Sequence, residues 1–476
     1  MKLYQIVAGA ILRSRRRFLY AALGVAVGTT AVIGALGTCG RQTPPGAELA
    51  GTSVPGATWV RQFGSSAADG ASGVAVDGAG NIILMGATDG ALPGQTQAGG
   101  RDAFVRKLGP AGAELWTRQF GSPGMEGASG VAVDGAGNII VAGYTDGTMP
   151  GQTKAGGRDA VVRKFSAAGA ELWTRQFGSP NPDEALAVAV DGAGNIIVVG
   201  RTVVPDYSAP ENVTEFGMLP GETPPGHSAA FVRKLSPAGV ELWASQFGSP
   251  VSDEALAVAV DGTGSIIVAG VVGRGDDAPN PVLPGQTPAG GADAFVRKLS
   301  PAGVELWTSQ FGSFFDDWAL GVAVDGTGDI IAVGYTEGTL PGQTAAGAGD
   351  AFVRKFSAAG IELWTSQFGS SAADGASGVA VDGTGSVITA GDTFGTLPGQ
   401  TSAAGQDAFV RKFSAAGAEL WTSQFGSAAW VGASGVAVDG SGNAIAVGGT
   451  DGALPGQTNL GSWDAFVVRL SQPLAP

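Results

Sequence analysis

The chain has 476 residues, and with 44% hydrophobic and only 14% charged residues it is too apolar for a disordered protein. One Cys and one His, Cys39 and His227, exclude a disulfide scaffold and metal sites built from several thiolates or imidazoles. The formal net charge of −14 argues against nucleic acid as a partner.

Residues 1–39 have the pattern of an export signal or a membrane anchor. Basic residues precede an apolar run at 18–38, and SRRRFL at 14–19 resembles the twin-arginine export motif. The run ends in LGTC, which resembles a lipobox and predicts lipidation of Cys39, although Thr38 departs from the usual Gly, Ala or Ser. An uncleaved anchor and a cleaved signal peptide remain alternatives, because the run has 21 residues and ALG at 35–37 suits a signal peptidase. Each alternative places the remainder outside the cytoplasm, in the cell envelope or secreted.

Two short segments flank the body of the chain. Residues 40–56 are rich in Gly, Pro and Thr and lack periodicity, which predicts a flexible tether, and residues 472–476 form a tail. Every acidic residue except Glu48 lies beyond residue 56. The body is therefore acidic, and we expect it to stay near an anionic membrane only through the N-terminal lipid or anchor.

The body, residues 57–471, consists of repeats. The motif W-x-x-Q-F-G-S occurs seven times, at intervals of 57 to 70 residues, and the Asp of an A-V-D-G motif always follows the Trp by 18 residues. A fixed period of this length indicates a repeat architecture.

One repeat predicts four short strands, which we label a to d in chain order. They are expected at 73–77, 81–88, 103–108 and 114–120, with tight turns at 78–80 and 110–112 and a longer b–c connection that contains LPGQT. Strands a and b are apolar at nearly every position, which is typical of sheets covered on both faces. No window of the body has a helical period.

Seven repeats of four antiparallel strands predict an all-β fold, a seven-bladed β-propeller. The body opens with a lone d strand at 57–63 and closes with a lone c strand at 465–470. We therefore expect the N-terminal outer strand to complete the last blade, since closure removes exposed sheet edges. A monomer is expected.

The repeat resembles a known family. The strings GVAVDGAGNIIVAG at 130–143 and RKFSAAGAELWTRQFG at 163–178 resemble the SBBP (seven-bladed beta-propeller) repeat of bacterial proteins, and the resemblance extends over 57–471. It implies an exported propeller of no established biochemical role. It supplies no catalytic motif to transfer.

Several polar residues recur in every copy or nearly so. Asp77 and its equivalents predict Asx-type turns between strands a and b, with Ca²⁺ as the alternative, although one carboxylate per turn is few for that ion. No other metal or cofactor is expected. A second Asp opens strand c and predicts a similar stapled turn, and the repeated Trp predicts packing between blades. Arg106 and Lys107 are expected to pair with Glu114.

Variation between copies points to one face of the propeller. The b–c and d–a connections share a face, and both long insertions, within 201–218 and 271–282, lie in b–c connections. Phe314, Phe315 and Trp318 lie beside the second insertion and either bind a ligand or pack under the insertions. The candidate ligand-binding residues on this b–c/d–a face are Tyr207, Glu211, Phe216, Asp276, Asp277, Phe314, Phe315, Asp317 and Trp318.

Acidic residues recur in the d–a connections of this face. Six of the seven copies have an acid ten residues after the Trp. They predict either a ring of carboxylates that attracts cations or basic partners, or a solvated polar loop. The six are Asp69, Glu126, Asp183, Asp253, Asp317 and Asp374.

These features favour a non-catalytic function. The leading hypothesis is a tethered binding or scaffold module whose b–c/d–a face contacts a protein or a glycan. The alternative is a carboxylate-dependent or quinone-dependent enzyme that uses the central channel, with the adjacent acids at 183–184, 253–254 and 316–317 as candidates. A surface protein without a ligand is a third hypothesis. No residue is assigned a catalytic role.

Overall fold

The computed structural model describes residues 53–202, 228–273, 281–403 and 405–471. The candidate residues Cys39, Tyr207, Glu211, Phe216, Asp276 and Asp277 lie outside the described residues. The described strands all belong to one compact unit, Val54–Pro476. Across the described ranges, no helix is both long and apolar enough to cross a bilayer.

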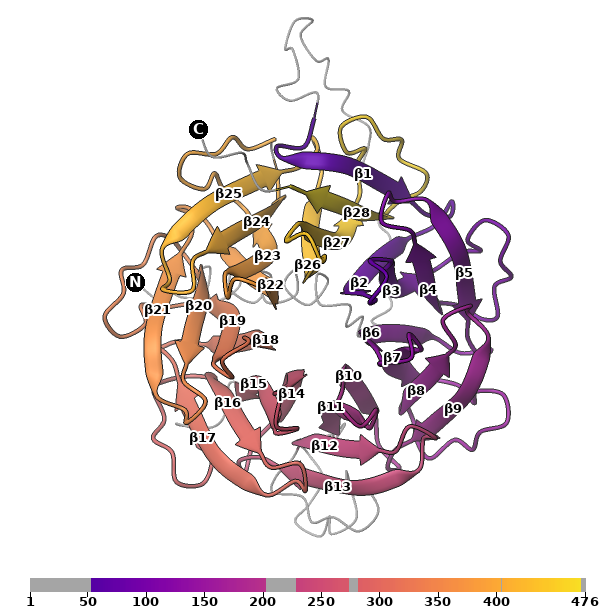
Figure 1. The fold of residues 1–476 in the computed structure, drawn as a ribbon, viewed down its shortest axis with the longest axis horizontal. Coiled ribbons are helices and arrows are strands. Elements are labelled where there is room, and N and C mark those ends of the chain that lie inside the picture. The colour runs from indigo at the N-terminus through magenta and orange to yellow at the C-terminus, as the bar shows by residue number, and fades with distance from the viewer. Residues whose placement is uncertain (1–52, 203–227, 274–280, 404, 472–476) are drawn as a thin grey trace, which may run out of the picture. The chain divides into compact units, whose positions relative to one another are not determined.

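The unit is a seven-bladed propeller of four-stranded antiparallel sheets (Figure 1). The a strands lie around the centre and the d strands form the rim, as predicted. The a strands are β2 (Asp69–Val76), β6 (Glu126–Val133), β10 (Asp183–Val190), β14 (Asp253–Val260), β18 (Asp317–Val324), β22 (Asp374–Val381) and β26 (Val431–Val438). The b strands are β3 (Ile82–Thr88), β7 (Ile139–Thr145), β11 (Ile196–Thr202), β15 (Ile266–Val272), β19 (Ile330–Thr336), β23 (Val387–Thr393) and β27 (Ala444–Thr450).

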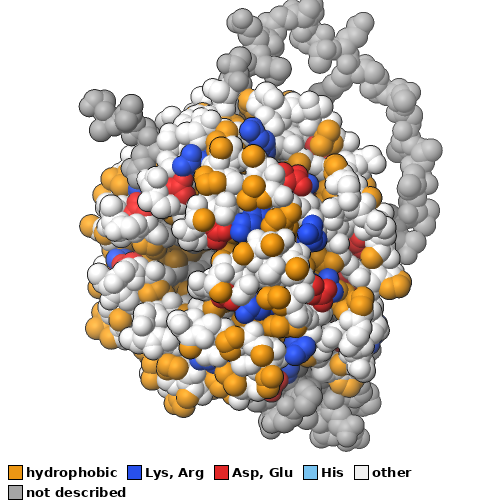
Figure 2. All heavy atoms as spheres, turned by 45° about the vertical axis from the view of Figure 1, so that its right-hand side comes forward, with side chains coloured by type: hydrophobic (Ala, Val, Ile, Leu, Met, Phe, Trp, Pro, Cys, Tyr) orange, Lys and Arg blue, Asp and Glu red, His pale blue; other side chains and the backbone are white. Residues whose placement is uncertain are grey.

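The outer half of each blade consists of strands c and d. The c strands are β4 (Asp102–Leu108), β8 (Asp159–Phe165), β12 (Ala229–Leu235), β16 (Asp293–Leu299), β20 (Asp350–Phe356), β24 (Asp407–Phe413) and β28 (Asp464–Leu470). The d strands are β5 (Glu114–Phe120), β9 (Glu171–Phe177), β13 (Glu241–Phe247), β17 (Glu305–Phe311), β21 (Glu362–Phe368), β25 (Glu419–Phe425) and β1 (Ala57–Phe63). On the side shown in Figure 2, hydrophobic, basic and acidic side chains are interspersed.

The ring closes as the sequence predicts. Strand β1 pairs antiparallel with β28, with Val60 opposite Val468 and Phe63 opposite Ala465, so the first strand of the body completes the seventh blade. This pairing covers the outer edge of β28.

Strand a is longer than predicted. It begins at Asp69 rather than at residue 73, because Asp69 and Ala71 pair with Thr88 and Gly86 before a bulge shifts the register. The approach is close: a Cβ on Gly86 would lie 1.9 Å from the carbonyl oxygen of Gly70. Glycine at this position therefore permits the bulge. The pattern of apolar residues in the sequence could not reveal the additional strand pairs before it.

The core lies between neighbouring blades. Ile83 and Val105 of the first blade pack with Ile139 and Val141 of the second, and Trp116 packs against the same cluster. The Trp116 Nε1–H donates to the carbonyl of Ala167 in the next blade at 3.3 Å. The predicted packing of the repeated Trp between blades is therefore confirmed.

The a–b turns contain the predicted Asx geometry together with a buried ion pair. Asp77 accepts the backbone N–H groups of Ala79 and Asn81, and its other oxygen lies 2.8 Å from Lys107 Nζ. Burial alone would raise the pKa of Asp77, but hydrogen bonds from Lys107 and Asn81 outweigh it and lower that pKa. The expected pairing of Lys107 with Glu114 is wrong, since strand alternation directs Lys107 to the turn and Arg106 to Glu114 at 3.6 Å.

Candidate functional site

The exposed part of the predicted patch is a pair of phenylalanines. Phe314 and Phe315 are 80% and 54% exposed, and their rings meet edge to face at 5.5 Å between centroids. Trp318 is the second residue of β18, is half-buried, and pairs across the sheet with Tyr335. Asp317 is fully buried, so the structure does not place it on the exposed surface.

The predicted ring of exposed acids is wrong. These carboxylates are the first residues of the a strands and are buried; Asp69 Oδ2, for example, accepts the Ser65 N–H at 2.6 Å. Burial is the main cause that raises the pKa of the Asp183, Asp253 and Asp317 carboxyls, each to about 7. The acids therefore close the d–a connection and do not present a cation-attracting rim.

The acid that opens strand c staples its connection, as predicted. Asp102 accepts the N–H of Ala98 at 2.7 Å and the side-chain amide of Gln119 at 2.8 Å. This acid also meets the first acid of the following blade, because a Cβ on Gly121 would lie 2.5 Å from a carboxylate oxygen of both Asp102 and Glu126. Only glycine fits between the two carboxylates.

Adjacent acids in strand a do not form paired acid–base sites. Asp183 accepts the Ser179 N–H, whereas Glu184 pairs with Arg201 at 2.7 Å on the other side of the strand. Neighbouring residues of a strand point to opposite faces. Elsewhere in the described ranges, no group of three or more His, Cys, Asp or Glu side chains is arranged to hold a metal ion.

Three register positions on the b–c/d–a face vary although their neighbours repeat. In each b strand, the residue just before the variable position is Gly in all seven blades. The variable positions themselves carry charged, aromatic and aliphatic residues as well as Gly. The second residues of the a strands are Gly70, Gly127, Glu184, Glu254, Trp318, Gly375 and Gly432. Their cross-strand partners in the b strands are Ala87, Tyr144, Arg201, Val271, Tyr335, Asp392 and Gly449. The residues just before the c strands are Arg101, Arg158, Ser228, Ala292, Gly349, Gln406 and Trp463.

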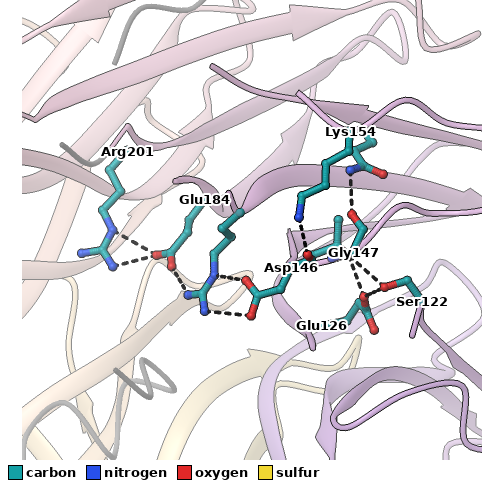
Figure 3. A network of polar contacts seen from close by, with 10 residues as sticks. Ser122, Glu126, Asp146, Gly147, Lys154, Glu184 and Arg201 are labelled. Carbon is teal, nitrogen blue, oxygen red and sulfur yellow. Dashed lines mark hydrogen bonds and ion pairs between the residues drawn. The ribbon is translucent and has the colours of Figure 1, made fainter. Parts of the chain in front are cut away.

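In the second to fourth blades these positions form one polar network (Figure 3). Arg158 pairs with Asp146 at 2.7 Å and with Glu184 of the next blade, and its guanidinium lies 4.1 Å from the centre of the Tyr144 ring. Arg201 then pairs with Glu184 and with Glu254 of the fourth blade. These ion pairs join three blades.

In the fifth to seventh blades the same face carries aromatic side chains and glycines. Besides the phenylalanine pair, Phe394 is 37% and Trp463 38% exposed, and Phe394 meets Trp430 edge to face at 5.8 Å. A Cβ on Gly375 would meet no atom within 4 Å, so open space lies in front of β22 at this level. The face is therefore polar in the second to fourth blades and aromatic in the fifth to seventh, with open space in front of Gly375.

Sequence reasoning named Trp318, Glu184 and Glu254 singly but did not recognise the positions that they share. Two of the three positions lie at fixed offsets from the repeated Trp, 11 residues beyond it in the a strands and 28 residues beyond it in the b strands. An alignment of the seven copies on that Trp would have found these two positions. A position that varies within a near-identical repeat is not needed for the fold, which indicates a role in contacts with other molecules.

Comparisons with known proteins agree with the fold. The family model described as the SBBP beta-propeller repeat matches residues 115–148. The uncharacterized WD repeat-containing protein L264 of Acanthamoeba polyphaga mimivirus is 24% identical over 368 residues, which are 62% of this chain and 26% of that protein. The regulatory protein FlaEY of Caulobacter vibrioides is 27% identical over 198 residues, 41% of this chain and 20% of that protein. The chain thus spans about a quarter or less of the length of these relatives.

The chain also matches solved structures, of which two are examples. The WD40 beta propeller domain of Doa1 is 11% identical, with a TM-score of 0.46 and coverage of 87% of this chain and 98% of that one. The polysaccharide lyase Uly1 is 10% identical, with a TM-score of 0.46 and coverage of 86% and 90%. The seven four-stranded sheets make the described part of the chain a seven-bladed propeller, and residues 115–148 within it match the SBBP beta-propeller repeat.

Proposed function

We propose that this propeller is a non-catalytic binding or scaffold module whose b–c/d–a face contacts a protein or a glycan. The observation that carries the proposal is the contrast between the two faces. Three register positions vary around the b–c/d–a face, whereas the opposite face repeats a turn in which Asp pairs with Lys in six blades and with Arg469 in the seventh. A constant scaffold with one variable face is the usual design of repeat proteins that bind a partner.

The exposed aromatic side chains supply the contact energy in this proposal. Aromatic anchors near the centre of an interface contribute most of its free energy, often about 2 kcal/mol or more each when truncated. Phe314 and Phe315 are 80% and 54% exposed, and they lie a few residues before the half-buried Trp318. The mimivirus relative is named as a WD repeat-containing protein, which supports a repeat-built scaffold.

A binding screen with paired variants tests this function. The full chain is screened against a glycan array and a panel of purified exported proteins, and every hit is repeated with the double variant Phe315→Ala/Trp318→Ala. We expect at least a tenfold loss of affinity with little change in melting temperature. Leu115→Ala is the control, since Leu115 is also exposed, at 54%, but lies on the outer strand β5. Full binding by the double variant, or loss of binding in the control, contradicts the assignment of the face.

We further propose that the chain is exported and tethered through Cys39. The support is the order of features in the sequence, a twin-arginine-like stretch followed by an apolar run that ends in LGTC. Cys39→Ser is expected to move the protein from the membrane fraction to the soluble fraction, because a lipid can no longer be attached to the thiol. Fractionation followed by immunoblotting measures this. Unchanged membrane partition would instead support an uncleaved span.

A further inference from the structure

The second blade contains an internal example of how this face holds a cation. Arg158, just before β8, lies with its guanidinium 4.1 Å from the centre of the Tyr144 ring. It pairs with Asp146 of its own blade and with Glu184 of the third blade. The niche between two blades thus accommodates a planar guanidinium between an aromatic ring and carboxylates.

The corresponding niche between the sixth and seventh blades lacks this cation. Gln406 stands in the place of Arg158, Asp392 in that of Tyr144, and Phe394 in that of Asp146. Gly432 stands in the place of Glu184 and leaves the wall from the seventh blade without a side chain. A carboxylate and an aromatic ring have therefore exchanged positions, and the arginine is absent.

Asp392 is a half-buried carboxylate that lacks a partner inside the described part of the protein. No hydrogen bond or ion pair among the described residues involves its side chain. Its cross-strand neighbour Gly375 has open space in front of it, and a Cβ on Gly432 would lie 3.9 Å from Asp392 Cβ and 3.3 Å from Gln406 Nε2. An uncompensated charge in such a place is unfavourable unless a cation joins it.

Aromatic rings flank the niche toward the surface. Phe394 lies just beyond the end of β23, two residues after Asp392, and its ring meets that of Trp430, which precedes Gly432 by two residues. A guanidinium gains from both features, since it pairs with a carboxylate and stacks on aromatic rings, whereas an ammonium is more strongly hydrated.

We propose that the niche around Asp392 binds the guanidinium group of an arginine side chain supplied by a peptide partner. This deepens the proposed function, on which it rests, by naming the chemistry that one part of the b–c/d–a face recognises. The partner's arginine occupies the position that Arg158 occupies between the second and third blades.

The niche is expected to bind better at higher pH. Burial, and next the charge of Asp374 on β22, raise the pKa of the Asp392 carboxyl to about 7. The comparison with the second blade identifies three other described residues at the niche, and all three are uncharged: Gln406, Phe394 and Gly432. An arginine side chain stays protonated, so affinity should increase from pH 6 to pH 8 as Asp392 ionises.

Isothermal titration calorimetry of the full chain with short peptides, blocked at both termini, tests the proposal. The probes are Gly-Gly-Arg-Gly-Gly and the same peptide with citrulline, which keeps the shape but lacks the charge, or with lysine. We expect the arginine peptide to bind at least tenfold more tightly than either. Asp392→Asn should reduce that affinity at least tenfold and abolish its pH dependence. Asp89→Asn, which removes an acid paired with Arg101 elsewhere on the face, should leave it unchanged.

A second variant keeps the test decisive if Asp392→Asn is poorly folded. Gln406→Arg restores the internal arginine of the second blade, so it should fill the niche, abolish peptide binding and leave the melting temperature unchanged or higher. The proposal is overturned if the arginine peptide does not bind, or if the citrulline or lysine peptide binds as tightly as the arginine peptide. Full binding of the arginine peptide by Gln406→Arg would also overturn it. The proposed function survives such a result if the Phe315/Trp318 variant still loses its partner.

Discussion

At the scale of single residues, the unusual feature is the number of carboxyls whose pKa is raised by burial. Asp183, Asp253, Asp317 and Asp392 each reach about 7, against an ordinary value of 3.8. An acid with a raised pKa in the folded protein binds more protons folded than unfolded, so its contribution to stability is lost as pH rises from about 4 through about 7. The turn acids such as Asp77 have lowered pKa values and are already ionised in both states above pH 5.

Stability should therefore fall between pH 5 and pH 8, by on the order of 1–2 kcal/mol for each raised group. Urea unfolding at the two pH values measures it. An imidazole ordinarily titrates near this range, so the measurement is made in the His227→Gln background, which has no histidine. Repulsion within the acidic body would act in the same direction but is screened by salt, whereas the buried groups are not. Stability that is constant or rises from pH 5 to pH 8 in 0.5 M NaCl contradicts this account.

At the scale of single elements, the close contact between strands a and b sets the bulge that every blade shares. Gly86→Ala should destabilise the protein by about 2 kcal/mol or more, because its Cβ would lie 1.9 Å from the Gly70 carbonyl oxygen and the backbone must move. Gly70→Ala is the matched control, since a Cβ there meets no atom within 4 Å, and its cost should stay within about 0.5 kcal/mol. Chemical denaturation of both variants checks this; equal costs would mean that the bulge relaxes freely.

The same element explains what the sequence could and could not predict. The apolar runs and the fixed Trp–Asp spacing predicted the four strands, their order and the closing strand β1. They failed at Asp69, because a polar residue in a Gly-rich stretch resembles a loop, and only the pairing of Asp69 with Thr88 reveals the strand. These patterns also failed to predict the partner of Lys107, because the a–b turn that contains Asp77 is distant from Lys107 in the sequence. Neither Asp392 nor its niche could be predicted, because the site is assembled from two blades.

At the scale of the whole molecule, stability depends on how the ring is closed. The hydrophobic cluster of the last blade joins Phe466, Val468 and Leu470 to Ala57 and Val60 of the first strand. Each blade packs only against its two neighbours. If the ring opens between the last and the first blade, the facing surfaces of both blades are therefore exposed, and not only one sheet edge. The closing strand also carries Gln62, whose amide donates to Asp464 at 2.8 Å and whose carbonyl accepts the Leu454 N–H.

Removal of residues 57–65 should therefore open the propeller. The deletion exposes the outer edge of β28, leaves the Leu454 N–H without its acceptor and removes one of the donors to Asp464, so we expect a melting temperature lower by 10 °C or more and aggregation through the free edge. Size-exclusion chromatography and circular dichroism melts measure both effects. Replacing Gln62 by Ala alone keeps the strand and should cost only the lost hydrogen bonds, about 1–3 kcal/mol, without aggregation. If the deleted protein stays monomeric and melts as the intact chain does, strand β1 is not what holds the ring closed.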